Sequence, residues 1–151
     1  MKIVARIAVI AVVVAFASVA QAHEKRIKLK DLPEPVRAAV LEQSKGGKIH
    51  ALTREVEGGK TTYEAELKFG ARGKDIVMDQ TGTVIEIEEQ VDFSALPAAV
   101  QAALKAGAGK GTLGRVESIT KNGVLTTYEA QVTAGGKKSE IKVAPDGSAL
   151  K

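Results

Sequence analysis

Carboxylates at alternate positions are the residues of this sequence whose types and spacing could do chemistry. Glu64 and Glu66 lie two residues apart in a segment that alternates apolar and polar residues. Because successive side chains of a β-strand point to opposite faces, residues two apart share a face. The predicted acidic face consists of Glu64, Glu66, Asp75, Asp79, Glu86 and Glu88, and Lys68 is the one opposing charge on it.

Three interpretations of this acidic face stay open from the sequence. A row of carboxylates can recognise a basic partner through complementary charge. Carboxylate oxygens are also the ligands that Ca²⁺ prefers, so the face could hold that ion loosely. The third interpretation is an ordinary solvated sheet face, whose charges prevent edge-to-edge aggregation.

The two histidines offer a second kind of metal chemistry. His23 would be the first residue of the chain after removal of residues 1–22, and His50 is the only other histidine. A terminal amine and an imidazole nitrogen are ligands that suit Cu²⁺. The sequence therefore predicts a possible copper site at His23 or His50, and a terminal histidine without a role is the alternative.

No arrangement of residues supports catalysis. The chain has six serines and two histidines but no G-x-S-x-G elbow, so no nucleophile and base can be paired. Cysteine is absent, which removes thiol chemistry and thiolate metal sites. The carboxylates lie on an open face with no predicted pocket around them. We expect a protein that is not an enzyme and that needs no cofactor.

Residues 1–22 have the layout of a secretory signal peptide. Lys2 and Arg6 precede an uncharged apolar run at residues 7–17, and Ala20-Gln21-Ala22 is a small-residue cleavage motif. An uncleaved membrane anchor is the alternative, but the run is too short to span a bilayer comfortably. The sequence predicts a periplasmic or secreted protein with no stable membrane anchor after cleavage.

The charge and aromatic content argue against nucleic acid as a partner. Removing 22 of the 151 residues leaves 129, and these carry 20 basic and 18 acidic side chains. A nucleic-acid binder usually has a clear basic excess on one face. Only four aromatic residues remain, which is too few for a platform on which bases stack.

Helix and strand signals alternate twice along the chain. A Leu-Pro start followed by apolar residues four apart predicts helices from Leu32 to about Gly46 and from Leu96 to about Gly107. Alternating patterns between glycine turns predict antiparallel strands. The predicted strands cover residues 49–56, 61–69, 74–79, 84–91, 113–120, 125–133 and 138–144, with a stub at 148–151, and residues 23–30 are left unassigned.

The sequence also repeats itself. Residues 61–86 and 126–151 share eight identical positions of 26, and a predicted helix precedes each copy. A single copy of about 60 residues would be marginally stable alone. We therefore expect two copies that pack side by side, and the sequence leaves open whether they form one sheet or two.

Three motifs recur in order and resemble those of the PepSY-type domain. They are a Leu-Pro-x-x-Val helix start, a Gly-Gly turn followed by Tyr-Glu, and an Asp-x-x-Gly-x-Val-Ile segment, which stand here from Leu32, Gly58 and Asp79. The second copy matches from Leu96, Gly123 and Asp146, but it has Ala144 where the first has Asp79. The arrangement is similar to tandem PepSY-like proteins related in fold to the β-lactamase inhibitor protein.

The resemblance implies an α+β fold of two tandem α-β-β-β(β) repeats, residues 23–91 and 92–151, whose antiparallel sheet has helices packed on one face. It implies an exported, non-enzymatic binding module that docks a protein or peptide of the cell envelope on the open sheet face. Inhibition or regulation of a peptidase has been proposed for such domains. The alternative function is metal binding, through His23 for copper or the acidic face for calcium.

Overall fold

The protein is described here from a computed structural model, in which residues 23–150 are placed. The predicted signal peptide, residues 1–22, lies outside the described residues, as does the C-terminal residue. Neither helix of the described chain combines the length and the apolar character that a membrane crossing needs.

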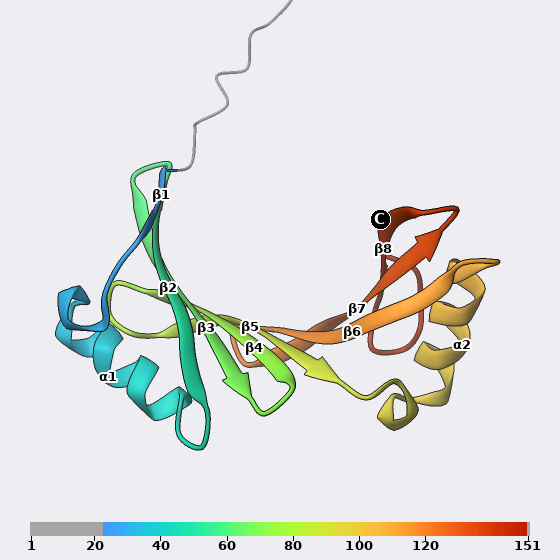
Figure 1. The fold of residues 1–151 in the computed structure, drawn as a ribbon, viewed down its shortest axis with the longest axis horizontal. Coiled ribbons are helices and arrows are strands. Elements are labelled where there is room, and N and C mark those ends of the chain that lie inside the picture. The colour runs from blue at the N-terminus through green and yellow to red at the C-terminus, as the bar shows by residue number, and fades with distance from the viewer. Residues whose placement is uncertain (1–22, 151) are drawn as a thin grey trace, which may run out of the picture.

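A single antiparallel sheet of eight strands forms the body of the described chain, and its strands are paired in sequence order from β1 to β8 (Figure 1). Alternating side chains and glycine turns along the sequence favour this meander. The strands are β1 His23–Arg26, β2 Lys48–Glu57, β3 Lys60–Phe69, β4 Arg72–Asp79, β5 Val84–Val91, β6 Thr112–Lys121, β7 Val124–Ala134 and β8 Lys137–Val143.

Two α-helices lie on the same face of this sheet. They are α1 Glu34–Gln43 and α2 Ala98–Ala108, and short 3-10 turns, η1 Leu29–Asp31 and η2 Phe93–Ala95, lead into them. Pro33 and Pro97 precede the first helical residues, where the missing N–H of proline costs no hydrogen bond. Figure 1 shows that the ends of the sheet bend away from the helices, so the face opposite α1 and α2 is concave.

The predicted α+β fold of two tandem α-β-β-β(β) repeats, with helices covering one face of the sheet, is wrong. The described chain forms one continuous eight-stranded sheet with only two α-helices. Eight strands span about 34 Å, at ~4.8 Å between neighbours, whereas a helix is only about 10 Å wide. Two short helices therefore cover the two ends of the sheet and leave much of it bare.

Each helix packs into its own hydrophobic core. Val36 and Val40 of α1 are completely buried against β2, β3 and β4, where Leu67, Ile76 and Met78 are also completely buried. The second core gathers Val100 and Leu104 of α2 with Val116, Ala130 and Val143. The β5–β6 pair joins the two cores through six residue pairs, from Glu86 opposite Lys121 to Val91 opposite Val116.

The N-terminal and C-terminal ends of the chain complete the two edges of the sheet. His23–Arg26, which the sequence left unassigned, forms β1 and pairs with β2. At the other edge the predicted stub at residues 148–151 is reduced to a bridge between Ala149 and Val143. The C-terminal segment therefore covers only a small part of the β8 edge.

Candidate functional site

The concave face, defined as the sheet face opposite α1 and α2, brings together five of the six predicted carboxylates. Glu66 lies directly opposite Asp75, and Asp75 lies directly opposite Glu88, so three acidic residues form a row across β3, β4 and β5. Directly opposed residues have their Cβ atoms about 4.5–5.5 Å apart. The adjoining row holds Glu64 and Glu86 on either side of Val77.

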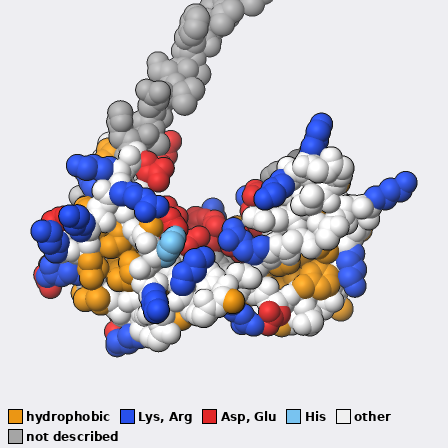
Figure 2. Space-filling model, in the orientation of Figure 1, with side chains coloured by type: hydrophobic (Ala, Val, Ile, Leu, Met, Phe, Trp, Pro, Cys, Tyr) orange, Lys and Arg blue, Asp and Glu red, His pale blue; other side chains and the backbone are white. Residues whose placement is uncertain are grey.

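The residues at the floor of the concave face are nearly inaccessible to solvent although no helix covers them. Ala51, Thr53 and Ile119 lie on this face and are only 5–7% exposed. Glu117 of β6 is also buried, at 9% exposure. Figure 2 shows the acidic side chains gathered in the hollow between the two raised ends of the sheet. The curvature and the long side chains together exclude water from the floor.

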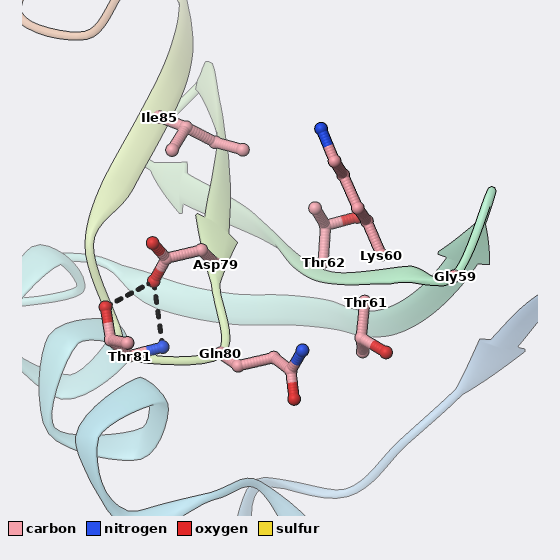
Figure 3. Close-up of a pocket in the computed structure, with 8 residues that line it drawn as sticks. All are labelled: Gly59, Lys60, Thr61, Thr62, Asp79, Gln80, Thr81 and Ile85. Atoms are coloured by element: carbon pink, nitrogen blue, oxygen red, sulfur yellow. Dashed lines mark hydrogen bonds between the residues drawn. The ribbon is translucent and has the colours of Figure 1, made fainter.

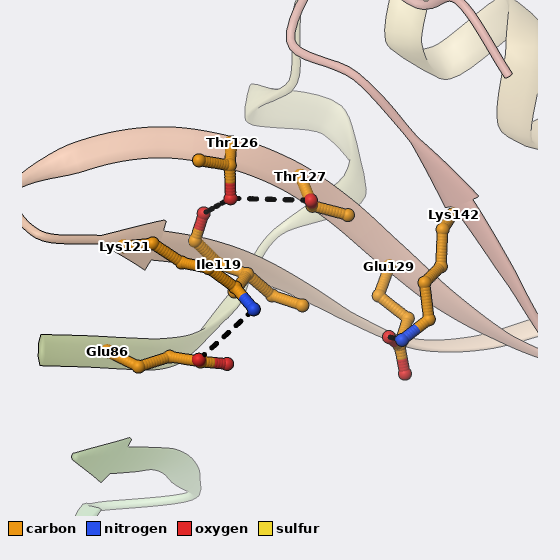
Figure 4. Close-up of polar contacts among 7 residues, drawn as sticks. All are labelled: Glu86, Ile119, Lys121, Thr126, Thr127, Glu129 and Lys142. Atoms are coloured by element: carbon orange, nitrogen blue, oxygen red, sulfur yellow. Dashed lines mark hydrogen bonds and ion pairs between the residues drawn. The ribbon is translucent and has the colours of Figure 1, made fainter. Parts of the chain in front are cut away.

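Ion pairs divide the carboxylates of this face into two groups. Glu86 accepts from the Lys121 ammonium at 3.2 Å and Glu129 from the Lys142 ammonium at 2.7 Å (Figure 4). Glu117 pairs with Arg115 at 3.1 Å. By contrast, within the described part of the chain no Lys or Arg forms an ion pair with the four residues called here the open carboxylates: Glu64, Glu66, Asp75 and Glu88.

Burial and mutual repulsion raise the pKa values of three of the open carboxylates, Glu64, Asp75 and Glu88. Burial is the largest cause for Glu88, and the charges of Glu86, Glu117 and Glu129 add to it, so that its pKa rises to about 7. Burial also raises the pKa of Glu64 and of Asp75, and neighbouring carboxylates raise both further. For Asp75, the charges of Lys68, Arg115 and His50 oppose part of this rise. The site therefore holds negative charge that is costly in the absence of a cation.

Glutamine at position 88 is expected to remove a pH-dependent loss of stability. The folded protein holds the Glu88 proton up to about pH 7, whereas an ordinary glutamate, with a pKa of 4.5, has lost it. Stability should therefore fall as pH rises through this interval. We expect Glu88→Gln to match the wild type at pH 4 and to be about 1 kcal/mol more stable at pH 8, after allowance for solvent screening of a half-buried group.

Urea unfolding at several pH values between 4 and 8 measures this difference. Glu42→Gln, which changes an exposed glutamate of α1, serves as the control and should follow the wild type apart from a small constant offset. Parallel pH profiles for Glu88→Gln and the wild type would show that the Glu88 pKa is not raised by folding.

Asp79, the sixth predicted carboxylate, lies on the same face by register, opposite Thr62, but its carboxylate is bound within its own turn. It ends β4, and one of its oxygens accepts hydrogen bonds from the Thr81 backbone N–H at 2.8 Å and the Thr81 hydroxyl at 2.6 Å (Figure 3). The same oxygen accepts a third hydrogen bond from the Thr83 N–H at 3.0 Å. These hydrogen bonds, led by that from the Thr81 hydroxyl, lower the pKa of Asp79. Asp79 stabilises the β4–β5 turn, beside a shallow cavity of about 350 Å³.

The metal-ligating predictions find little support in the geometry. His23 pairs with Val56 at one end of β2, while His50 lies six residues away in the same strand, so their backbones are about 20 Å apart at ~3.3 Å per residue. Among residues 23–150, no group of three or more acidic, histidine or cysteine residues is arranged to hold a metal ion. The two histidines therefore do not form a joint site, and a copper site made by the amine and imidazole of His23 alone stays a prediction.

Sequence reasoning missed the carboxylates that the C-terminal strands add to this face. Glu117 and Glu129 lie directly opposite each other in β6 and β7. Alternation within each strand indicates that they point outward, but only the β5–β6 pairing places them on the same face as Glu88. Their ion-pair partners depend on the same register, so the division between paired and open carboxylates could not be predicted.

Comparisons with known proteins give a likeness in fold. No protein-family model matches the chain, and no curated protein matches its sequence. A Bacteroides eggerthii protein, described as provisionally periplasmic, aligns with a TM-score of 0.64 at 16% identity over 80% of this chain and 86% of its own. A DUF2874 family protein of Bacteroides ovatus aligns with a TM-score of 0.60 at 16% identity, over 80% and 85%.

A third structure supplies a name for the fold. A BLIP-like protein of Bacteroides fragilis aligns with a TM-score of 0.58 at 20% identity, over 80% of this chain and 84% of its own. Identities this low establish similarity of fold and nothing more. The tandem PepSY-like arrangement is not among the features that these comparisons support. The chain shares a BLIP-like fold with these Bacteroides proteins.

Proposed function

We propose that this chain is an exported, non-enzymatic binding protein that holds a basic segment of a protein or peptide partner on its concave face. The observation that carries the proposal is the row Glu66, Asp75 and Glu88, in which three half-buried carboxylates are directly opposed and have no cation paired with them within the described residues. Like charges directly opposite each other destabilise a sheet, so an external cation would relieve a cost that folding leaves in place.

The magnitude of the electrostatic gain favours a partner that places its charge close to these residues. A unit charge 4 Å from an opposite one gains about 4 kcal/mol at an effective dielectric constant of 20. The nearly dry floor formed by Ala51 and Ile119 reduces screening by water. A lysine or arginine side chain lying along the row could contact several of the open carboxylates at once.

The dimensions of the concave face suit a protein partner. Strands of eight residues, such as β4 and β5, are about 26 Å long, and the sheet is about 34 Å wide. The face therefore offers on the order of 900 Å², close to the ~800 Å² that each partner contributes to a standard interface. The BLIP-like fold is compatible with this use of the face, because the resemblance noted from the sequence implies docking on the open sheet face; a peptidase partner rests on the PepSY part of that resemblance alone.

Export is the second part of the proposal. Residues 1–22 carry the pattern of a secretory signal peptide, and a protein of similar fold is provisionally placed in the periplasm. The absence of cysteine is compatible with either compartment, because the two apolar cores hold the fold by packing. We place the partner in the cell envelope for this reason.

Reversal of two open carboxylates should weaken capture of this partner. The chain without residues 1–22 is immobilised and exposed to an extract of the native cell envelope, and the retained proteins are eluted with salt and identified. The double variant Glu64→Lys/Glu66→Lys is expected to retain at least about tenfold less of a partner that the wild type retains, since two charge contacts are replaced by repulsion.

A matched variant distinguishes an effect of the concave face from an effect of the net charge of the protein. Glu42→Lys/Glu89→Lys makes the same change in net charge, but Glu42 lies on α1 and Glu89 is an exposed residue on the helix side of β5. This control should capture the partner as well as the wild type does. Equal capture by all three proteins would refute docking on the concave face.

A further inference from the structure

A second cavity lies at the edge of the sheet formed by β1, where β1 leads into η1. Its volume is about 350 Å³, and its lining consists of Lys25, Arg26, Ile27, Lys28, Asp31 and Arg54. The lining thus includes four cationic residues and one acidic residue. By register, Lys25 and Arg54 lie on the helix side of the sheet, whereas Arg26, opposite Thr53, lies on the concave side. This volume lies at the low end of the ~300–1,000 Å³ range of small-molecule sites.

The strand register places two of these cations directly opposite each other. Lys25 of β1 pairs with Arg54 of β2, and Arg54 in turn lies opposite Tyr63, which is buried in the α1 core. Both side chains are therefore on the helix side of the sheet, away from the concave face. Like charges directly opposite each other destabilise a sheet.

No internal carboxylate relieves this repulsion within the part of the chain that is described. None of the four cations forms an ion pair with an Asp or Glu there, and Asp31 is the only acidic residue that lines the cavity. Figure 2 shows Lys and Arg side chains gathered over the end of the molecule that holds α1 and β1. The uncompensated charge at the cavity is positive.

We propose that this cavity binds a phosphate group, either as a small organic phosphate or as the headgroup of an anionic lipid. The Arg54 guanidinium has the planar fork that contacts two phosphate oxygens at once, and the Lys25 and Lys28 ammonium groups supply point charges beside it. Ile27, whose N–H is bound to the Leu52 carbonyl at 3.0 Å, gives the cavity a fixed apolar wall for the organic part of the ligand.

The phosphate site is independent of the concave face, because it lies on the opposite side of the sheet and has the opposite charge. The next residue pair along the same two strands, Glu24 opposite Glu55, belongs to the concave side. The helix side of the β1–β2 pair thus carries Lys25 and Arg54, whereas the concave side carries Glu24 and Glu55 together with Arg26. Failure of one proposal leaves the other intact.

Titration with inorganic phosphate and with glycerol 1-phosphate, followed by calorimetry in chloride buffer of matched ionic strength, tests the site. The chain without residues 1–22 should bind at least one of them saturably, and Lys25→Gln/Arg54→Gln should bind it at least about tenfold more weakly, because two charged hydrogen-bonding groups are lost. The control Lys110→Gln/Lys137→Gln removes two exposed lysines elsewhere and should bind as the wild type does.

Sedimentation with vesicles distinguishes the two sources of the phosphate group. Vesicles of phosphatidylglycerol in phosphatidylcholine should retain the protein through Lys25 and Arg54 if the ligand is a headgroup, whereas pure phosphatidylcholine vesicles should not. Saturable binding of glycerol 1-phosphate without vesicle binding identifies a free organic phosphate. Either result supports the site, provided that the Lys25→Gln/Arg54→Gln variant loses it.

A double-mutant cycle for stability gives a readout that unspecific surface charge would not change. In chloride buffer, Lys25 and Arg54 should repel each other, so their coupling should be unfavourable, and the bound phosphate should reduce or reverse it. The proposal is overturned if none of phosphate, glycerol 1-phosphate and phosphatidylglycerol vesicles binds, if the control variant loses binding equally, or if the ligand that binds leaves the coupling unchanged.

Discussion

Replacing Leu67 with alanine is expected to lower the free energy of unfolding by about 2–5 kcal/mol. Leu67 is completely buried in the core under α1, and it lies in β3 next to Glu66 of the concave face. Truncation removes the packed methyl groups and leaves a cavity that the rigid sheet can fill only in part. Urea unfolding followed by circular dichroism measures the loss.

The same variant tests whether the sheet behaves as one unit. Half of this chain would be marginally stable alone, and the β5–β6 pair connects the two cores through six residue pairs. We expect a single unfolding transition, in which backbone amides of β6 and β7 lose protection from hydrogen exchange along with those of β3. Full protection of β6 and β7 in the Leu67→Ala protein would mean that the two ends of the sheet unfold independently.

Replacing Gly82 with alanine is expected to cost about 2–4 kcal/mol, from backbone strain and a clash together. Gly82 has a φ of +81°, and an added Cβ would lie 2.5 Å from the carbonyl oxygen of Pro35 at the start of α1. The corresponding Gly147, with a φ of +87°, meets Ala99 of α2 in the same way at 2.8 Å. Close contact between a turn and a helix start thus recurs at both ends of the sheet.

Gly58 provides the matched control for this prediction. Its φ is also positive, at +55°, but an added Cβ would meet nothing within 4 Å. Gly58→Ala should therefore cost only the strain, about 1–2 kcal/mol. If Gly82→Ala and Gly58→Ala lower the urea midpoint equally, close packing of the β4–β5 turn on α1 contributes nothing to stability.

Local patterns in the sequence predicted the individual elements well. The apolar spacing of Leu32, Val36 and Val40 indicated α1, and all three residues are buried in its core. Strict alternation in β3 placed Tyr63 and Leu67 inward and Glu64 and Glu66 outward, as the structure has them. Both patterns follow from periodicity alone, which a single sequence displays directly.

These local patterns could not predict which strands pair over long distances in the sequence. The continuity of the sheet depends on the register between β5 and β6, whose partners are separated by a helix and two turns. β1 is short and rich in charge, so it lacks the apolar alternation that identifies a strand, and it is held by hydrogen bonds to β2. The repeat in the sequence therefore predicted two copies packed side by side and left open whether they form one sheet, whereas the described chain forms one continuous sheet with two small helices.

The candidate site was predicted in composition but not in detail. Alternation found Glu64, Glu66, Asp75, Glu86 and Glu88, which lie on one face. Asp79 also lies on this face, opposite Thr62, but a strand pattern does not show that a terminal carboxylate will accept hydrogen bonds from its own turn. Alternation also gave no sign that Lys121 pairs with Glu86 and leaves Glu88 open, since that depends on the register across the centre of the sheet.

The dissociation constant of the captured partner, measured with purified proteins at low and high salt, tests docking on the open carboxylates most directly. The wild type should bind more weakly as salt increases, because the attraction between exposed charges is screened. Glu64→Lys/Glu66→Lys should bind at least about tenfold more weakly at low salt, while Glu42→Lys/Glu89→Lys matches the wild type. Equal dissociation constants for all three proteins, independent of salt, would contradict the proposed function.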